Sequence, residues 1–231
     1  MEDEERSFVE AARRAKRVAL EAAGIPAFAY RYERTHDAAD AAAAYRDEMG
    51  EDGPRVAVAG RIDSIRSKGK TAFLHIEDAS GRIQVYLRRD ELSEQWVLVE
   101  QLDLDDHLGV TGRLFRTKAG EVSVRAEELT LLSKSLRPLP RGKTQAASEG
   151  VVVHGGLADP EVRYRQRYAD LAVHREVRAV FQLRARAIRW MRRYLDDLGF
   201  LEVETPILQP LYGGAAARPF ITHHNSLDMP L

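Results

Sequence analysis

The stretch from Arg55 to Arg88, RVAVAGRIDSIRSKGKTAFLHIEDASGRIQVYLR, decides the fold because it contains strand-like apolar runs separated by short breaks. Apolar residues at every second position indicate a strand with one buried face. Three such runs follow one another, Val56–Ile62, Phe73–Ile76 and Ile83–Leu87, and the third follows a turn at Ser80-Gly81. We therefore expect three consecutive β-strands.

The residues after these strands extend the pattern. Residues 90–101 are compatible with a helix, and two more strand-like runs follow at Leu108–Leu114 and Val122–Leu131, with a turn at Ala119-Gly120 between them. Three strands, a helix and two strands is the order of the OB-fold, a five-stranded barrel often used to hold single-stranded nucleic acid. Other small barrels share this order, so the order alone does not settle the fold.

The segments around the barrel predict helices and a linker. Residues 3–23 have apolar residues at helical spacing and end at Gly24, and Ala38–Glu48 predicts a second, short helix. Several glycines and prolines punctuate residues 134–160 and predict a connector. We expect an α+β protein with four parts: an N-terminal helical extension at 1–54, the barrel at 55–133, a linker at 134–160 and the start of a further domain at 161–231.

The last part begins with arginine-rich helices. An apolar stripe at helical spacing runs from Val177 to Leu198, and Gly199 is a natural cap beyond it. Phe200–Glu204 predicts a short strand, which Pro206 ends or bends. Because little sequence follows that could cover the stripe, we expect this part to be loosely packed or to self-associate.

Composition excludes several classes of protein. The net charge is -1, and the predicted barrel, Arg55–Leu132, holds 12 basic and 13 acidic residues, which favours a selective reader of a few bases over a general coat protein. The absence of cysteine excludes disulfides and cysteine–zinc sites. The acidic start MEDEERSF is unlike a secretory signal, and no apolar run approaches the roughly 18 to 20 residues that span a bilayer. We therefore expect a cytoplasmic address and no membrane partner.

Three motifs make a resemblance specific. LGFLEVETPIL, Leu198–Leu208, resembles the first signature motif of class II aminoacyl-tRNA synthetases. RYRQRYADL, Arg163–Leu171, and YGGAAARPFITHHNSLDM, Tyr212–Met229, resemble the segments that precede and follow this motif in the lysine-specific enzymes. The resemblance covers nearly the whole chain and implies that 161–231 begins an antiparallel-sheet catalytic domain. Aspartate- and asparagine-specific enzymes share the architecture and remain an alternative.

The resemblance also implies anticodon-binding residues. In that family the phenylalanine matching Phe73 stacks on the middle anticodon base, a uridine, and the residues matching Gln84 and Arg66 bond to the same base. Glutamine offers a donor and an acceptor to a uracil edge, and arginine donates to its carbonyls. Glu128 matches a carboxylate implied in reading the third anticodon position. Taken singly, a phenylalanine in a strand such as Phe73 is more often barrel core, and Gln84 could be a solvent-facing strand residue; the joint match of Arg66, Phe73 and Gln84 at the family spacing favours the anticodon role.

Further roles follow from the same resemblance. Gly214 matches a glycine that contacts the bound lysine, and Gly199, Phe200 and Pro206 fall in the motif that builds the family's dimer interface. The adjacent pair His223-His224 does not predict a metal site, because neighbouring strand residues point to opposite faces. We expect neither a metal site nor a catalytic residue in the chain.

The resemblance implies partners and an activity. The intact family enzyme is a homodimer that uses ATP and Mg²⁺ to activate lysine and then transfers the lysine to tRNA(Lys). The family's later arginine-bearing motifs and its lysine-recognising carboxylates are not found in these residues, as in a lysine–tRNA ligase fragment that ends before motifs 2 and 3. We therefore expect tRNA binding without adenylate formation. A stand-alone module for tRNA binding or dimerisation remains a second reading.

Overall fold

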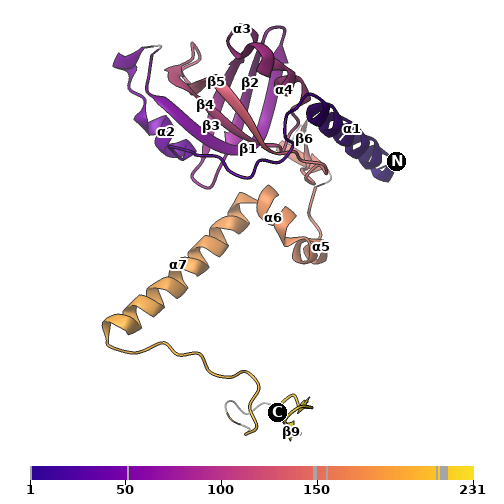
Figure 1. Cartoon of the computed structure of the whole chain (residues 1–231), viewed down its shortest axis with the longest axis vertical. Helices are drawn as coiled ribbons and strands as arrows, with labels where there is room; N and C mark the ends of the chain where they lie inside the picture. The colour runs from indigo at the N-terminus through magenta and orange to yellow at the C-terminus, as the bar shows by residue number, and fades with distance from the viewer. Residues whose placement is uncertain (1, 51, 148–149, 155, 212, 214–217) are drawn as a thin grey trace. The chain divides into compact units, whose positions relative to one another are not determined.

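The computed structural model describes the whole chain except residues 1, 51, 148–149, 155, 212 and 214–217, and it leaves out the side chains of 2–7, 143–147 and 150–154 as well. The described residues form two compact units, 1–158 and 159–231 (Figure 1). No helix in the described parts of the chain is both long and apolar enough to cross a membrane.

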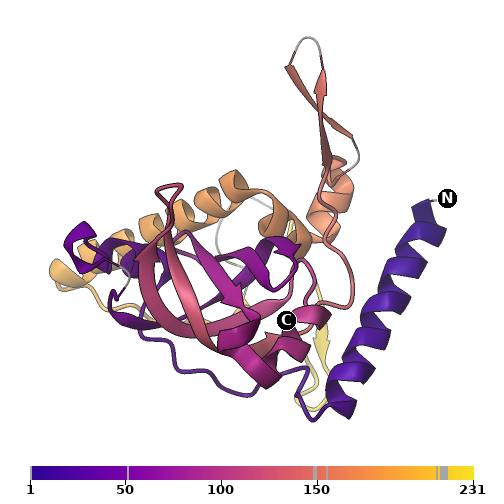
Figure 2. The ribbon, with the colours of Figure 1, turned by 90° about the horizontal axis from the view of Figure 1, so that it is seen from above.

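Helix α1 (Glu2–Ala22) confirms the predicted N-terminal helix and packs against the outside of the barrel with its C-terminal half (Figure 2). Its last turn closes at Gly24, whose φ of +74° lets the Ile25 N–H donate to the Leu20 carbonyl at 2.9 Å. The Leu20 side chain is fully buried. Lys16 donates to Asp103 at 2.6 Å, which fixes the helix to the loop before His107.

Five strands form a closed barrel in the order β1-β2-β3-β5-β4. β3 and β5 run parallel and the other pairs antiparallel. The first strand is long enough to pair with β4 along its first half and with β2 along its second. This is the predicted OB-fold order. The strand bounds are Arg55–Lys68 (β1), Thr71–Glu77 (β2), Arg82–Arg88 (β3), His107–Arg116 (β4) and Val122–Ser133 (β5).

The helix expected over residues 90–101 is broken into pieces. α3 (Arg89–Leu92) and α4 (Trp96–Gln101) are separated by a 3₁₀ turn at Ser93–Gln95. Ser93 has a φ of +47°, a left-handed conformation that a continuous α-helix does not contain. The broken segment still covers the barrel, because Leu92, Trp96 and Leu98 are buried.

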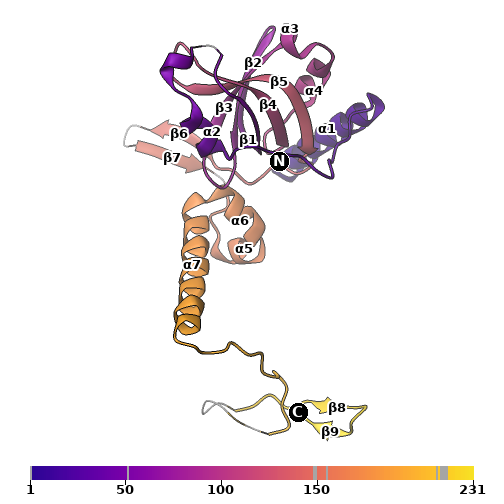
Figure 3. The ribbon, with the colours of Figure 1, turned by 60° about the vertical axis from the view of Figure 1, so that its left-hand side comes forward.

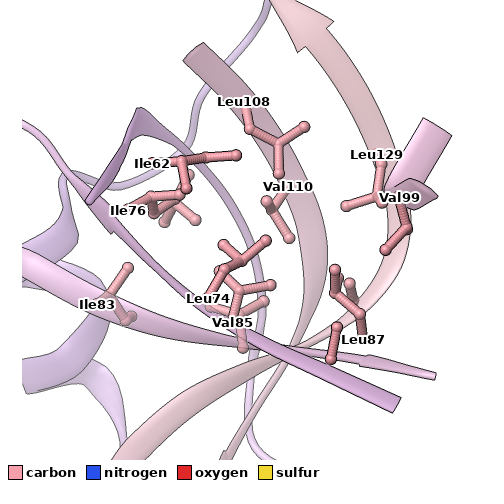
Figure 4. Packing of buried hydrophobic residues seen from close by; sticks show 14 of the residues in the cluster. Ile62, Leu74, Ile76, Ile83, Val85, Leu87, Val99, Leu108, Val110 and Leu129 are labelled. Atoms are coloured by element: carbon pink, nitrogen blue, oxygen red, sulfur yellow. The ribbon is translucent and has the colours of Figure 1, made fainter. Parts of the chain in front are cut away.

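The barrel core comes from the inward half of each strand's alternation. Leu74 and Ile76 of β2 face the interior together with Val85 and Leu87 of β3 (Figure 4). Each such side chain contributes roughly 1.5–3 kcal/mol by leaving water. The full set of the largest buried side chains is Leu20, Ile62, Leu74, Ile76, Leu87, Leu108, Leu114, Val56, Val58, Val85, Val110 and Val124.

Helix α2 (Ala38–Ala44) packs on β1 and β3 (Figure 3). The turn between β2 and β3 caps its start: the Ala38 N–H donates to the Asp78 carboxylate at 2.8 Å and the Ala39 N–H to Ser80 Oγ at 3.0 Å. The predicted second helix is therefore present but shorter than Ala38–Glu48. A separate 3₁₀ turn at Asp47–Met49 follows it.

A two-stranded hairpin, β6 (Lys143–Ala147) with β7 (Gly150–His154), ends the first unit's assigned structure. The second unit holds α5 (Pro160–Arg165), α6 (Arg167–Val173) and α7 (Arg175–Asp197), then a short pair of β8 (His223–His224) with β9 (Met229–Pro230). Gly199 closes α7 as predicted: its φ is +83° and the Phe200 N–H donates to the Leu195 carbonyl at 3.1 Å.

The strand expected at Phe200–Glu204 is wrong, because these residues carry no strand assignment. A strand requires a neighbour for its backbone N–H and C=O groups. No described segment pairs with Phe200–Glu204. The run Phe220–Thr222 likewise lies just outside a strand, and only the Thr222 backbone pairs, with Leu231.

Candidate nucleic-acid interface

The outward face of β2 and β3 gathers polar and aromatic side chains. Phe73 and His75 of β2 alternate with buried Leu74, so they project from the barrel. On β3, Gln84 and Tyr86 alternate with buried residues in the same way. The antiparallel register sets Phe73 opposite Tyr86, and sets His75 opposite Gln84.

Three aromatic rings adjoin on this face. Phe73 stacks on Tyr86 with ring centroids 4.6 Å apart and planes at 25°. Tyr86 in turn meets Phe115 of β4 at 5.8 Å and 48°. The Arg125 guanidinium lies 5.9 Å from the Phe115 centroid. A row of rings edged by a cation is the kind of surface on which unpaired bases stack.

A chain of hydrogen bonds runs beside the rings. The Gln84 Nε2 donates to Glu121 Oε2 at 2.8 Å, and the Ser123 Oγ donates to Gln84 Oε1 at 2.8 Å. His75 Nε2 meets Glu121 Oε1 at 2.9 Å, and its Nδ1 meets Ser64 Oγ at 2.8 Å. Glu121 lies in the turn between β4 and β5, so a loop residue joins the two central strands of the face.

Arg66 stands at the edge of the same face. It is exposed on β1, and its Cα is the register partner of Phe73. Within the part of the chain that the structure describes, its guanidinium makes no hydrogen bond or ion pair. Lys68 and Lys70 are exposed next to it, on either side of the tight turn at Gly69. The structure thus brings Arg66, Phe73 and Gln84 onto three adjacent strands.

Comparison with known proteins agrees with this geometry. The family model described as "OB-fold nucleic acid binding domain" matches residues 56–132, and the model "tRNA synthetases class II (D, K and N)" matches residues 159–230. The lysine–tRNA ligase of Bacillus subtilis is 46% identical over 224 residues, covering 95% of this chain and 43% of that protein. The lysine–tRNA ligase of Syntrophomonas wolfei is 49% identical over 213 residues, covering 92% and 40%.

The chain is homologous to the lysine–tRNA ligases. It spans less than half the length of these lysine–tRNA ligases. The matches confirm the resemblance drawn from Leu198–Leu208 and its two flanking motifs, and the barrel confirms the fold that this resemblance implies. A third lysine–tRNA ligase, from Halalkalibacterium halodurans, is 46% identical over 226 residues, or 96% of the chain and 43% of the relative.

Glu128 lies elsewhere on β5. It is exposed, and its Cα pairs with Thr111 next to a register shift in the β4–β5 ladder. Its electrostatic neighbours are Tyr32 and Arg55: burial raises the pKa of Tyr32, and the Glu128 carboxylate raises it further. No hydrogen bond or ring contact joins Glu128 to Phe73 or Gln84 among the described residues. The structure therefore groups three of the four predicted anticodon residues and sets the fourth apart.

The predicted residues outside the barrel are placed only in part. Gly214 lies outside the described residues. Gly199 and Phe200 form the cap of α7, and Pro206 is exposed, with its carbonyl accepting from Gln209 Nε2 at 2.8 Å. None of these positions tests a lysine site or a dimer interface, so both roles stay predictions.

Sequence reasoning missed four members of this face: His75, Tyr86, Phe115 and Glu121. Two of them carried a usable signal, because a period of two puts His75 on the face of Phe73 and Tyr86 on the face of Gln84. Phe115 and Glu121 carried none. They reach the face only because β5 pairs in parallel with β3, a long-range pairing that local patterns do not encode.

Proposed function

We propose that this chain reads the anticodon of a tRNA, with tRNA(Lys) as its partner, on the outward face of β2 and β3. One observation carries the proposal: Phe73 offers a ring, Gln84 an amide and Arg66 a guanidinium on three adjacent strands of an OB-fold barrel. Recognition of a single-stranded base requires a ring to stack on and groups that meet the base edge.

The ring of Phe73 is suited to stacking. It is half-buried and already stacked on Tyr86, so it loses little freedom when a base binds. Stacking of one base on an aromatic side chain is worth about 1–3 kcal/mol. This term holds any base, so selectivity must come from the polar groups beside it.

The polar groups suit uracil at the middle anticodon position. Uracil presents an N–H between two carbonyl groups, and an amide can meet an N–H and a carbonyl together. The exposed Arg66 carries only donors, so it favours a carbonyl over the amino group that cytosine presents. Together these two residues favour uridine over cytidine.

The modest charge of the barrel is consistent with selective binding. Most basic side chains near the face are already paired with acids, as Arg116 is with Asp47 at 2.6 Å. Exposed Lys68 and Lys70 remain beside Arg66 for backbone phosphates. We expect the binding constant to fall only slowly with salt concentration, because each phosphate neutralised on a single strand contributes only about 0.7 to the slope of log K against log [salt].

Glu128 is assigned to the neighbouring, third anticodon base. It is an exposed acceptor on the same strand as Ser123, five residues further along. This separation suits a single-stranded loop whose bases are splayed apart. A carboxylate accepts from the amino or imino groups of a base edge. This assignment rests on position and on the resemblance, and it is tested separately from Phe73.

We propose that this chain serves the lysine–tRNA ligase reaction for which its relatives are named. The relatives are named lysine–tRNA ligases, which implies ATP use, with lysine and Mg²⁺ as further participants. The described residues contain no group of three side chains that could hold a metal ion. Neither a Mg²⁺ site nor a catalytic step is assigned to them.

Homodimerisation is proposed for helix α7. Its apolar side chains Phe181, Met191 and Leu195 are exposed and share one face at helical spacing, and the apolar exposure continues past the cap at Phe200. A second copy of the same helix would cover such a face in the symmetric way usual for homodimers. Sedimentation velocity tests this: a concentration-dependent dimer supports it, and a monomer at every concentration contradicts it.

The deciding experiment is binding of the purified chain to an anticodon stem–loop with the sequence UUU, beside one whose middle U is changed to C. We expect UUU to bind roughly tenfold more tightly, since an unsatisfied polar group costs about 1–3 kcal/mol. Phe73→Ala should weaken both complexes. Equal binding of both loops, or none, would contradict the proposal.

A stem–loop carrying the aspartate or asparagine anticodon tests the alternative specificity. Tighter binding to either than to UUU would move the assignment to an aspartate- or asparagine-specific relative. The second reading, a stand-alone module, shares the predicted UUU preference and differs only in lacking any ligase duty.

A further inference from the structure

The carboxamide of Gln84 is held at both ends. Its Nε2 donates to Glu121 Oε2 at 2.8 Å, and its Oε1 accepts from Ser123 Oγ at 2.8 Å. One N–H and one lone pair of the amide remain for a ligand. These two groups lie beside the Phe73–Tyr86 stack, since Gln84 and Tyr86 share one face of β3.

A free glutamine cannot tell uracil from cytosine by itself. Uracil presents a carbonyl and then an N–H along its edge, whereas cytosine presents an amino group and then a bare ring nitrogen. A carboxamide offers one donor and one acceptor, and rotation by half a turn exchanges their order. Selectivity therefore requires something that fixes which end of the amide points which way.

The two partners of Gln84 differ in this respect. The Ser123 hydroxyl both donates and accepts, so it tolerates either orientation of the amide. The ionised Glu121 carboxylate only accepts. If the amide were reversed, Gln84 Oε1 would face Glu121 Oε2, and two acceptors would repel each other. Glu121 is thus the group that breaks the symmetry of the amide.

Glu121 is itself held in place. Its second oxygen, Oε1, meets His75 Nε2 at 2.9 Å, and His75 Nδ1 meets Ser64 Oγ at 2.8 Å. Because a carboxylate cannot donate, Nε2 must carry the proton of this contact, while the Ser64 hydroxyl, which can donate or accept, pairs with Nδ1. The carboxylate is anchored from β2 while it orients a residue of β3.

We propose that Glu121 is a specificity-determining positioning residue, which locks the Gln84 amide in one orientation and thereby sets the preference between uracil and cytosine. The proposal rests on the anticodon-binding function proposed above and adds a residue to it. Glu121 need not touch the base. Its effect passes through Gln84 alone, which gives it a distinctive signature in binding measurements.

The test uses the isosteric variant Glu121→Gln. A second carboxamide can donate or accept, so the variant keeps the shape and the hydrogen bond but loses the lock. We expect its UUU-to-UCU affinity ratio to fall on the order of fivefold, mainly because UCU binds better. Some preference for UUU remains through Arg66, which acts independently of the amide.

The control is a double-mutant cycle with Gln84→Ala. In that background Glu121→Gln should leave the UUU-to-UCU ratio unchanged, because there is no amide to orient. Ser123→Ala, which removes the partner that tolerates both orientations, should change the ratio less than Glu121→Gln does. Circular dichroism checks the fold of each variant, and the exposure of Glu121 favours an intact barrel.

The outcomes separate the two proposals. If the unmodified chain prefers UUU and Glu121→Gln keeps the full preference, the positioning role is overturned and the anticodon function stands. An equal effect of Glu121→Gln with and without the Gln84 amide also overturns it, since Glu121 would then act on the RNA directly. If the unmodified chain shows no preference, both proposals fall together.

Discussion

The phenyl ring of Phe73 lies stacked on the phenol ring of Tyr86, with centroids 4.6 Å apart. The two residues are register partners on antiparallel strands, so the stack is set by the backbone pairing. Because Tyr86 supports one face of the Phe73 ring, that ring keeps one orientation in water, whereas an isolated exposed phenylalanine would sample several. The strand register therefore places an already ordered ring on the face where a base would stack.

The first prediction concerns this support. Tyr86→Leu should weaken binding of the UUU stem–loop by about three- to tenfold, because an aromatic pair is worth about 0.5–1.5 kcal/mol beyond its buried area. Since Tyr86 supplies no edge contact, the UUU-to-UCU ratio should stay the same. Fluorescence anisotropy with labelled stem–loops measures both. A changed ratio would show that Tyr86 takes part in reading the base.

The second prediction concerns a buried ion cluster. The Lys134 ammonium is fully buried and donates to Asp106 at 2.7 Å, to Asp103 at 2.6 Å and to the Gln101 carbonyl at 2.7 Å. Lys134→Met leaves the buried Asp106 carboxylate without its cation and should cost about 3–5 kcal/mol of unfolding free energy. Urea unfolding of the first unit measures the loss.

The matched control is Lys134→Met combined with Asp106→Asn, which removes both charges and keeps an acceptor oxygen for one of the two backbone N–H groups that Asp106 holds. Burial raises the pKa of Asp106 against the pull of Lys134, so the carboxylate is costly once the ammonium is gone. The double variant should recover part of the stability. Strict additivity of the two single losses would contradict the buried pairing.

Local signals in the sequence were sufficient to predict the barrel. Alternation in β2 and β3 predicts which residues are inward, because Leu74, Val85 and their neighbours repeat at a period of two. The glycine stops at Gly24 and Gly199 are equally local, since each needs only a positive φ after a helix. Such features are encoded within a few residues.

Other features depend on distant partners and were missed. The strand expected at Phe200–Glu204 has the right composition, but a strand forms only against a neighbour. Glu121 reaches Gln84 across the parallel β3–β5 pairing, which no short window of sequence contains. Ser93 interrupts the helix over 90–101 through a positive φ, which its residue type did not predict because serine, unlike glycine, is not typical of left-handed backbone.

The third prediction compares two glycines. A Cβ at Gly24 would meet no atom within 4 Å, so Gly24→Ala carries only the backbone cost of a left-handed alanine, about 1 kcal/mol. A Cβ at Gly112 would lie 2.0 Å from the Arg125 carbonyl oxygen, which belongs to the barrel wall. Gly112→Ala should therefore destabilise the barrel by clearly more than Gly24→Ala, as thermal unfolding of both variants would show. Equal losses would mean that the β4–β5 ladder yields easily at its register shift between Thr111 and Gly112.

The fourth prediction concerns acid. Burial would raise the pKa of the Asp170 carboxyl, but hydrogen bonds from Arg163 and His174 and the charge of Arg167 hold it below its ordinary value of 3.8. A carboxyl with a depressed pKa stabilises the fold above the unfolded-state value and loses that contribution as pH falls through the folded-state value. The contribution of the Asp170 carboxylate to the packing of α5 on α6 should therefore be lost only below about pH 4. Carboxyl-carbon NMR of Asp170 follows its titration, and Asp170→Asn should reproduce the weakened state at neutral pH, because an amide keeps the shape but attracts the arginines less. If Asp170 titrates at or above its ordinary value, Arg163, Arg167 and His174 do not share this carboxylate in solution.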